Sequence, residues 1–228
     1  MVKNISNLGD TAVYCDFGSE VNETINASVI DYFHHISKLI NDKKIDGITN
    51  LTPSYNKLII SFNLRKTNFK KLKSIIENLD IKNNDRLENK KIEIPICIDE
   101  QFSLDIKRLE KKLNVNRDKI YENFFNKIFF CYMTGFIAGM PFLGDLDEDM
   151  RVERLETPRV RVPKGSVGLT EQFANIYTFE SPGGWNIIGN TPLDVFDSSK
   201  KIEPNLINPG DTIIFKKITK NQHFNFND

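Results

Sequence analysis

Hydrophobic and polar residues alternate along this chain with two different periods, and the first part of the chain shows both. Residues 23–40 and 69–79 carry apolar side chains at spacings of three and four, which is the spacing of one face of a helix. Residues 10–17, 45–50 and 57–62 are short runs rich in strand-forming residues, with a Thr-Pro-Ser turn before the third run. The order strand, helix, strand, strand, helix predicts a small α/β sandwich with its helices on one face of a sheet.

A polar stretch at residues 80–91 interrupts these patterns. It is rich in charged residues and contains no aromatic residue, which is typical of a linker or an exposed connection. We therefore predict two domains, an N-terminal α/β domain at residues 1–85 and a second domain at residues 90–228.

The second domain begins with mixed elements and continues as strands. Residues 91–99 alternate between apolar and polar, as a half-buried strand does, whereas residues 103–113 and 116–127 have helical spacing, the latter with Asn116 as a candidate N-cap. From residue 128 onward, short apolar runs are separated by Gly/Pro turns, and a Pro-Gly-Asp turn precedes the final run. This composition predicts a closed or nearly closed β-barrel, which places the whole chain in the α+β class.

An uncharged run at residues 128–143 could be mistaken for a membrane span. It is shorter than the ~20 apolar residues that a spanning helix needs. It also contains Gly135, Gly139 and Pro141. We predict a buried strand followed by a loop.

Charge, cysteine content and the N-terminal residues narrow the classes of function. The chain has 31 basic and 31 acidic side chains in 228 residues, and its formal net charge is zero. It has no dense basic tract, so we expect no nucleic-acid partner. Cys15, Cys97 and Cys131 lie far apart among apolar residues, which predicts free, buried thiols. The first residues lack the apolar region and cleavage site of a secretory signal, so we expect a cytoplasmic protein without membrane contact.

The stretch at residues 133–185 is dense in glycine and proline, which predicts shaped loops between strands that form a site. Within it, Arg159 and Arg161 are two positions apart, so both guanidinium groups would lie on the same face of a strand. Arginine matches carboxylate and phosphate groups with two parallel hydrogen bonds, so this pair could clamp an anionic substrate or nucleotide. The alternative is that both arginines pair with acids on a neighbouring strand.

Further candidates follow in the same stretch. Gln172 could bind an amide or lactam, because its side chain both donates and accepts, or it could serve in a turn. Gly183 and Gly184 could let backbone N–H groups approach a ligand or could form a tight turn, and Trp185 could wall a pocket or belong to the core. The Lys-Gly-Ser sequence at residues 164–166 lacks the spacing of a phosphate loop, and we discard that interpretation.

Several self-contained catalytic motifs are absent from the sequence. It contains no GxSxG, no HExxH and no metal-spaced Cys/His set. His34 and His35 are neighbours on a predicted helix and do not share a face, so we expect solvated surface residues rather than a metal site, and only His223 lies in the second domain. The catalytic residues therefore remain unassigned, and another chain would supply much of the chemistry.

Five motifs occur in an order that identifies a family. They read GDTAVYCDFG, GFIAGMPFLGDL, TPRVRVPKGSVGL, SPGGWNIIGNTP and NPGDTIIF, and they are distributed along nearly the whole chain, from residue 9 to residue 215. With them the sequence resembles the B subunit of bacterial 5-oxoprolinase. The same family includes the Kip-type inhibitors of sporulation histidine kinases and the domain called allophanate hydrolase subunit 1.

The resemblance implies a small N-terminal α/β domain followed by a cyclophilin-like β-barrel. It implies that the chain joins the A and C subunits of 5-oxoprolinase, of which C is also cyclophilin-like, and that the complex uses ATP to open the ring of 5-oxoproline and give L-glutamate. ATP belongs to the complex and need not touch this chain. We expect the residues that match the family motifs to line a pocket or a subunit junction: Arg159, Arg161, Gln172, Gly183, Gly184 and Trp185.

The chain departs from the family pattern at several positions. Ala138 and Met140 replace a proline and an aromatic residue, Phe124 and Phe125 stand where relatives commonly have His–Ser, and Asn190 replaces an arginine. These substitutions remove polar groups from the expected site. Two alternative functions therefore stand beside that of an oxoprolinase component. One is a Kip-type regulator that binds a histidine kinase, and the other is a component related to urea carboxylase or allophanate hydrolase.

Overall fold

The chain folds into two compact units, Met1–Glu88 and Asn89–Asp228. The structure is a computed structural model, and it describes residues 2–81, 89–200 and 202–226. Most of the predicted linker, residues 82–88, lies outside the described residues. Each unit has apolar clusters of its own.

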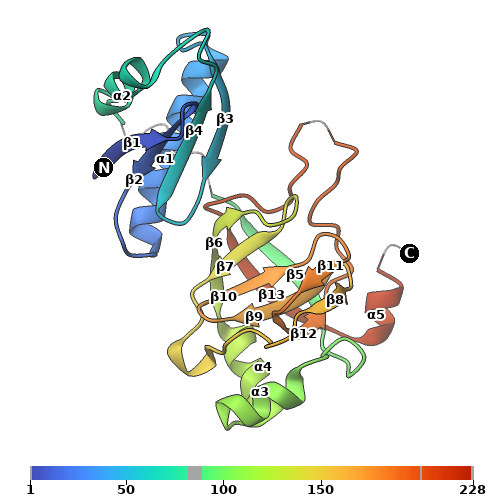
Figure 1. Ribbon diagram of the computed structural model, residues 1–228. Coiled ribbons are helices and arrows are strands. Elements are labelled where there is room, and N and C mark those ends of the chain that lie inside the picture. Colours follow the sequence, from blue (N-terminus) through green and yellow to red (C-terminus); the bar gives the residue numbers. More distant parts are fainter. Residues whose placement is uncertain (1, 82–88, 201, 227–228) are drawn as a thin grey trace. The chain divides into compact units, whose positions relative to one another are not determined.

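The first unit is a four-stranded antiparallel sheet with two helices (Figure 1). The strands lie in the order β1-β2-β4-β3. The elements are β1 (Asn4–Leu8), β2 (Ala12–Asp16), α1 (Glu23–Asn41), β3 (Ile48–Pro53), β4 (Lys57–Phe62) and α2 (Phe69–Glu77). The α+β class and the small N-terminal sandwich are confirmed.

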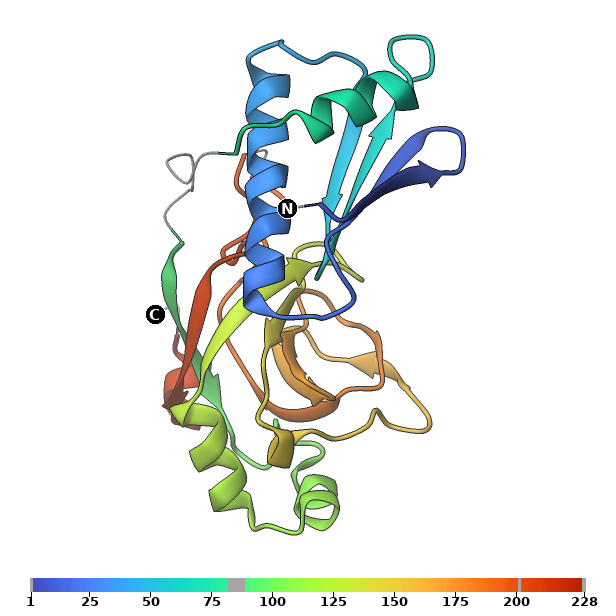
Figure 2. The same ribbon diagram turned by 90° about the vertical axis from the view of Figure 1, so that its left-hand side faces the viewer.

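Both helices pack on one face of this sheet (Figure 2). On β4 the alternate residues Leu58, Ile60 and Phe62 are buried, because successive side chains of a strand point to opposite faces. They form one apolar cluster with Val29 of α1 and Leu72 of α2. The predicted helical faces at residues 23–40 and 69–79 are therefore the faces that bury this core.

Two details of the first unit differ from the sequence prediction. We did not predict β1, because its residues are polar and largely exposed, and only hydrogen bonding to β2 identifies it. We expected a turn around Pro53, but Pro53 is the last residue of β3 and the turn follows it. A proline is tolerated there because β3 lies at the edge of the sheet and its free side needs no N–H donor.

The second unit is a closed barrel of seven strands, as predicted. Around the barrel the strands follow the order β10-β7-β6-β13-β5-β12-β9. They are β5 (Lys91–Cys97), β6 (Ile128–Thr134), β7 (Pro141–Gly144), β9 (Ser166–Thr170), β10 (Phe173–Ile176), β12 (Asn186–Asn190) and β13 (Thr212–Ile218). The first and last strands of this unit, β5 and β13, are parallel neighbours, and their pairing is part of the closed barrel.

The uncharged run at residues 128–143 forms β6, a connecting loop and the start of β7. Phe129 and Cys131 of β6 point into the barrel core, whereas the intervening Phe130 points outward and pairs in register with Gly144. This agrees with the predicted strand and loop. In the part of the chain that the structure describes, no helix is long and apolar enough to span a membrane.

Three α-helices accompany the barrel in the part of the chain that the structure describes. They are α3 (Ile106–Leu113), α4 (Arg117–Asn126) and α5 (Lys220–Phe224). Asn116 caps α4 as predicted, since its side chain accepts a hydrogen bond of 2.9 Å from the N–H of Lys119. We did not predict α5, which is a single short turn held by a capping box between Thr219 and Gln222.

The cysteines are free and buried, as predicted. Burial raises the pKa of the Cys15 thiol to about 12. The expectation for the helical histidines was wrong, because His34 and His35 are both partly buried. Burial lowers the pKa of His34, since a charged imidazole loses its hydration there.

Candidate functional site

A two-stranded ribbon lies against the outer face of the barrel (Figure 1). Its strands, β8 (Arg159–Val162) and β11 (Ser181–Gly183), pair antiparallel with Gly183 opposite Arg159. Beneath the ribbon lies an apolar cluster that we call the outer-face cluster: Met140, Val162, Tyr177, Trp185 and Ile187, with Ile137, Phe142 and Phe173 partly buried around it. The ribbon and this cluster bring together four of the six predicted site residues.

Tyr177 is the polar centre of the outer-face cluster. Its side chain is only 1% exposed, and its hydroxyl group makes no well-formed hydrogen bond among the described residues. Burial raises the pKa of this hydroxyl group, because the phenolate would lose its hydration, and the nearby Asn175 side chain and Trp185 backbone offset the rise only in part. Buried polar atoms without partners are rare, and each calls for a bound group or a water molecule.

The strand β11 approaches the Tyr177 ring as closely as a glycine allows. A Cβ atom added to Gly183 would lie 2.1 Å from the Tyr177 oxygen, which is far inside contact distance. The backbone of the ribbon therefore covers the hydroxyl group directly. Any side chain at this position would displace either the ribbon or the ring.

Arg159 reaches from the ribbon to the start of α3. Its Nη2 atom donates to Oδ1 of Asp105 at 2.6 Å, and the second oxygen of Asp105 accepts from the N–H of Ile187 at 2.7 Å. The Nη1 atom of Arg159 is buried and has no partner in the described parts of the chain. Because Asp105 neutralises the guanidinium charge, the free Nη1 donor suits a neutral carbonyl oxygen better than a second carboxylate.

Arg161 lies apart from this arrangement. Its side chain is 79% exposed, and its Nε atom is 3.7 Å from a carboxylate oxygen of Glu180. Both arginines thus contact acids of this chain, which was the alternative left open by the sequence. Asp105, however, comes from the residue before α3 and not from a neighbouring strand.

Gly184 and Trp185 continue the chain beyond β11. The carbonyl oxygen of Gly184 accepts from the N–H of Leu155 at 2.7 Å. Trp185 is buried in the outer-face cluster, where it meets Phe142 edge-to-face at 5.5 Å, and the guanidinium group of Arg154 lies 5.9 Å from its ring. The glycine pair therefore forms a strand end and an approach to a buried ring rather than a tight turn.

Gln172 lies in the turn between β9 and β10, one of the two roles that the sequence allowed. Its amide group donates to Oδ1 of Asp145 at 3.0 Å, and the other oxygen of Asp145 accepts from the hydroxyl group of Tyr132 at 2.7 Å. The structure groups Gln172 with this carboxylate and not with Arg159.

Sequence reasoning missed the residues that complete the ribbon site. Asp105 and Tyr177 are buried polar partners of Arg159 and Gly183, yet neither stands in a recognisable short motif. Ser181 has a buried hydroxyl group without a partner among the described residues. Asp105 lay inside the segment predicted as a helix, residues 103–113, and only the structure shows that it is the residue before α3.

Two departures from the family pattern have a structural role. Phe124 is buried and packs against Phe215 with 4.8 Å between ring centroids. Asn190 donates to the carbonyl oxygen of Lys164 and lies 2.8 Å from Nε2 of His223. The substitutions thus supply a core contact and an anchor for α5.

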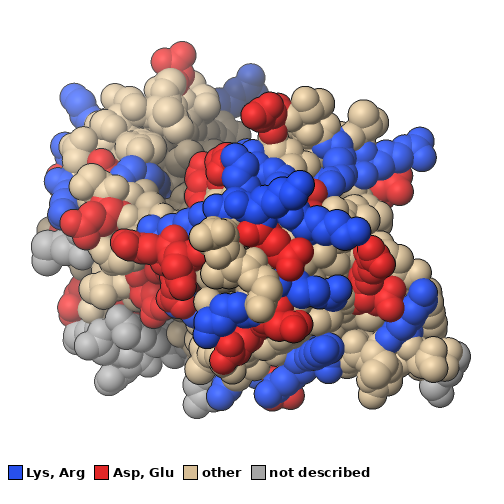
Figure 3. Space-filling model, turned by 90° about the horizontal axis from the view of Figure 1, so that it is seen from below, with Lys and Arg blue, Asp and Glu red and all other residues tan. Residues whose placement is uncertain are grey.

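The surface around α3 carries charges of both signs. Arg108 binds the side chains of Asn186 and Glu153, and Lys112 is 2.7 Å from the same carboxylate of Glu153. Basic and acidic side chains are likewise interspersed over the face seen in Figure 3. This face has no extended field of a single sign.

Residues 3–207 match the family described as carboxyltransferase domain, subdomain C and D. The chain belongs to this family. Among its carboxyltransferase C/D relatives, the 5-oxoprolinase B subunit of Bacillus subtilis (strain 168) is 27% identical over 231 residues, which cover 96% of this chain and 94% of the relative. The B subunit of Haemophilus influenzae 5-oxoprolinase is 37% identical over 149 residues, or 64% of this chain and 69% of the relative. The protein is of the 5-oxoprolinase B-subunit type.

Two solved structures and a yeast enzyme are also similar to this chain. The crystal structure of TTHA0988 has a TM-score of 0.80 and 25% identity over 92% of this chain, which spans 40% of that chain's length. The conserved uncharacterized protein PH0987 from Pyrococcus horikoshii has a TM-score of 0.57 and 32% identity over 96% of this chain and 100% of its own. Urea amidolyase of Saccharomyces cerevisiae is 21% identical over 93% of this chain but only 13% of its own length.

Proposed function

We propose that this chain is the B subunit of an ATP-dependent 5-oxoprolinase in the cytoplasm, and that it acts with the A and C subunits of that enzyme to convert 5-oxoproline to L-glutamate. The observation that carries the proposal is the match to a 5-oxoprolinase B subunit over 96% of this chain and 94% of the relative. A match of this extent includes both units of the chain and not one shared domain alone.

The reaction must overcome the stability of a lactam, which is a poor electrophile. Transfer of the γ-phosphoryl group of ATP to the lactam oxygen releases ADP and activates the ring carbon. Water then attacks that carbon, the ring C–N bond breaks as a proton passes to nitrogen, and a second water releases phosphate and leaves glutamate. Cationic donors beside the lactam oxygen favour this sequence because they offset the negative charge of the phosphoryl group that is transferred to it.

Within the complex, we assign the lactam-facing role to the ribbon site. The free Nη1 atom of Arg159 would donate to the lactam oxygen, with Asp105 holding the guanidinium group in place. About a quarter of the Arg159 side chain is open to solvent, since its exposed fraction is 28%. Residues that would line the surrounding pocket or a subunit junction are Arg161, Gln172, Gly183, Gly184 and Trp185.

The turn at residues 164–166 does not fit the triphosphate of ATP. It leads into β9 rather than into a helix, and Lys164 is engaged by Asp194 at 2.5 Å. We therefore place ATP with the complex and derive no step of the reaction from these residues.

The proposal is tested by reconstitution. The purified chain is mixed with its A and C partners, and glutamate release from 5-oxoproline is measured with and without ATP. We expect release only when all three proteins and ATP are present. Absence of release from an assembled, soluble complex of the three would overturn the proposal.

A matched set of variants tests the role of Arg159. Arg159→Gln alone leaves Asp105 buried without a counter-charge and should destabilise the barrel, so the informative variant is Arg159→Gln with Asp105→Asn. We expect this double variant to fold and to lower turnover by about 100-fold, as loss of a donor to a developing oxyanion does. Arg65→Gln, an exposed control in the first unit, should change turnover by less than about twofold. Normal turnover in the folded double variant would make Arg159 a structural residue.

A further inference from the structure

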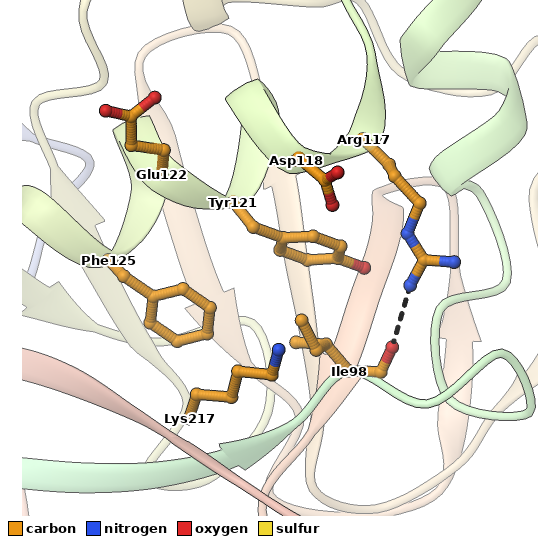
Figure 4. A pocket seen from close by; sticks show the side chains of 7 residues that line it. All are labelled: Ile98, Arg117, Asp118, Tyr121, Glu122, Phe125 and Lys217. Atoms are coloured by element: carbon orange, nitrogen blue, oxygen red, sulfur yellow. Dashed lines mark hydrogen bonds between the residues drawn. The ribbon is translucent and has the colours of Figure 1, made fainter.

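A cavity opens on the barrel unit, built from residues that the proposed function does not use. Its volume is about 420 Å³. It lies between the end of β5, the helix α4 and the strand β13 (Figure 4). The lining residues are Ile98, Arg117, Asp118, Tyr121, Glu122, Phe125 and Lys217. A cavity of this size falls within the range of small-molecule sites.

Two aromatic rings form one wall of this cavity. Tyr121 and Phe125 are one helical turn apart on α4, with ring centroids separated by 6.1 Å and planes inclined by 31°. The hydroxyl group of Tyr121 is fixed by hydrogen bonds to Ser103 at 2.8 Å and to the carbonyl oxygen of Ile188 at 2.9 Å. The Tyr121 ring is therefore held in one orientation before any ligand binds, which lowers the entropic cost of binding.

Two cationic groups flank these rings without a carboxylate of their own. Among the described residues, no carboxylate lies within 4 Å of the Lys217 ammonium group or the Arg117 guanidinium group. The guanidinium group lies 5.8 Å from the Tyr121 ring centroid and makes one long hydrogen bond of 3.5 Å to the carbonyl oxygen of Ile98. In Figure 4 the Lys217 side chain points toward the rings. The adjacent Lys216, by contrast, lies 3.7 Å from Glu93.

The carboxylates at the rim are not paired with these two cations. Glu122 is engaged by Lys119 at 3.0 Å, one turn along the helix surface, and points away from the rings in Figure 4. Asp118 is then the single carboxylate of the lining residues left to offset Arg117 and Lys217. The cavity thus combines two aromatic rings with two cationic groups that have no carboxylate within 4 Å among the described residues.

We propose that this cavity binds a small planar carboxylic acid. Its ring would lie against Tyr121 and Phe125, and its carboxylate would be bound by Lys217 and Arg117. The recognition depends on both parts, because an amine of the same shape would be repelled by the two cations and an amide would lack the charge. This site is separate from the ribbon site, so its test does not depend on the oxoprolinase assay.

Three probes of the same shape and different charge test the proposal. Benzoate, benzamide and benzylamine are titrated into the full chain, and amide signals are followed by two-dimensional NMR. We expect benzoate to shift signals of residues 117–125 and 217, and the other two probes to shift them far less at equal concentration. Equal shifts with benzylamine, or no shifts with benzoate at millimolar concentration, would overturn the proposal.

Neighbouring lysines provide a matched pair of variants. Lys217→Ala should weaken benzoate binding by about tenfold, as loss of a charged hydrogen-bond partner does. Lys216→Ala removes the same charge one position along the strand, where the side chain points to the opposite face, and should leave the affinity within about twofold. Dispersed NMR spectra verify that both variants fold. An unchanged affinity in Lys217→Ala, or equal losses in the two variants, would place benzoate elsewhere and contradict the proposal.

Discussion

At the scale of single residues, the adjacent glycines Gly183 and Gly184 have different surroundings. A Cβ atom at Gly183 would meet the hydroxyl oxygen of Tyr177 at 2.1 Å, whereas the nearest atom to a Cβ at Gly184 is at 3.6 Å, an ordinary contact. Tyr177 cannot yield, because its ring is packed in the outer-face cluster. The sequence predicted a close approach at this pair but could not say which of the two glycines makes it.

This difference gives a paired prediction for stability. Gly183→Ala should lower the free energy of unfolding by about 1–3 kcal/mol, because an added methyl group overpacks a filled site. Gly184→Ala should change it by less than about 0.5 kcal/mol. Urea unfolding followed by Trp185 fluorescence measures both, since Trp185 is the single tryptophan. Equal effects of the two substitutions would contradict the close contact.

The environment of Arg159 could be predicted from the sequence only in part. Its spacing from Arg161 indicated two guanidinium groups on one face, yet their environments differ, with side chains 28% and 79% exposed. The difference arises because Arg159 has the buried carboxylate of Asp105 within reach, 54 residues away in the sequence. No local pattern carries that information.

At the scale of elements, α5 is joined to the barrel through His223. The imidazole lies 2.8 Å from Oδ1 of Asn190 and 4.4 Å, between ring centroids, from Phe102. Burial lowers the pKa of His223, because the protonated ring loses hydration next to these groups. The folded state therefore prefers the neutral histidine.

The lowered pKa predicts a loss of barrel stability in mild acid. When the folded pKa is depressed, the stabilisation is complete above the unfolded pKa of about 6.5 and is lost as the pH falls through the folded value. We expect the urea concentration at the unfolding midpoint, followed by Trp185 fluorescence, to be lower at about pH 5 than at about pH 8. The difference between the two pH values should be smaller in His223→Gln.

His34 supplies the control for this prediction. Burial also lowers the pKa of His34, but this residue lies in the first unit, whereas Trp185 and His223 lie in the second. His34→Gln should leave the pH dependence of the Trp185 signal unchanged. An equal effect of both substitutions would show that His223 is not the responsible group.

Elements on the margins of sheets were the hardest to predict. The long helices α1 and α2 and the buried strands followed their periodicity because each buries one face in a core. The strand β1 and the helix α5 bury little and carry no such pattern, so hydrogen bonding to a neighbour decides them. The sequence placed Arg159 and Arg161 on one strand but did not predict that this strand pairs with β11, because both strands are short and lie outside the barrel.

At the scale of the whole molecule, each of the two units has apolar clusters of its own. One cluster belongs to the first unit, and the barrel core and the outer-face cluster belong to the second. Each unit therefore buries its own apolar surface, as a domain that folds alone does.

This division predicts that the second unit folds without the first. A fragment of residues 89–228 should unfold cooperatively in urea, with a Trp185 emission spectrum matching that of the full chain. The full chain serves as the control in the same experiment. A fragment that unfolds without cooperativity, or whose tryptophan emits as in water, would show that the barrel depends on the first unit.

The sequence by itself determined the periodic elements, the α+β class, the burial of the thiols and the family, because these depend on residues within a few positions of one another or on ordered motifs. Tertiary structure decided which distant groups meet. Asp105 beside Arg159, Gly183 against Tyr177 and Asn190 beside His223 all depend on the order in which the strands close the barrel. The physical reason is that the spacing of apolar residues indicates only whether a side chain is buried. A site depends in addition on which distant segment of the chain packs against that side chain.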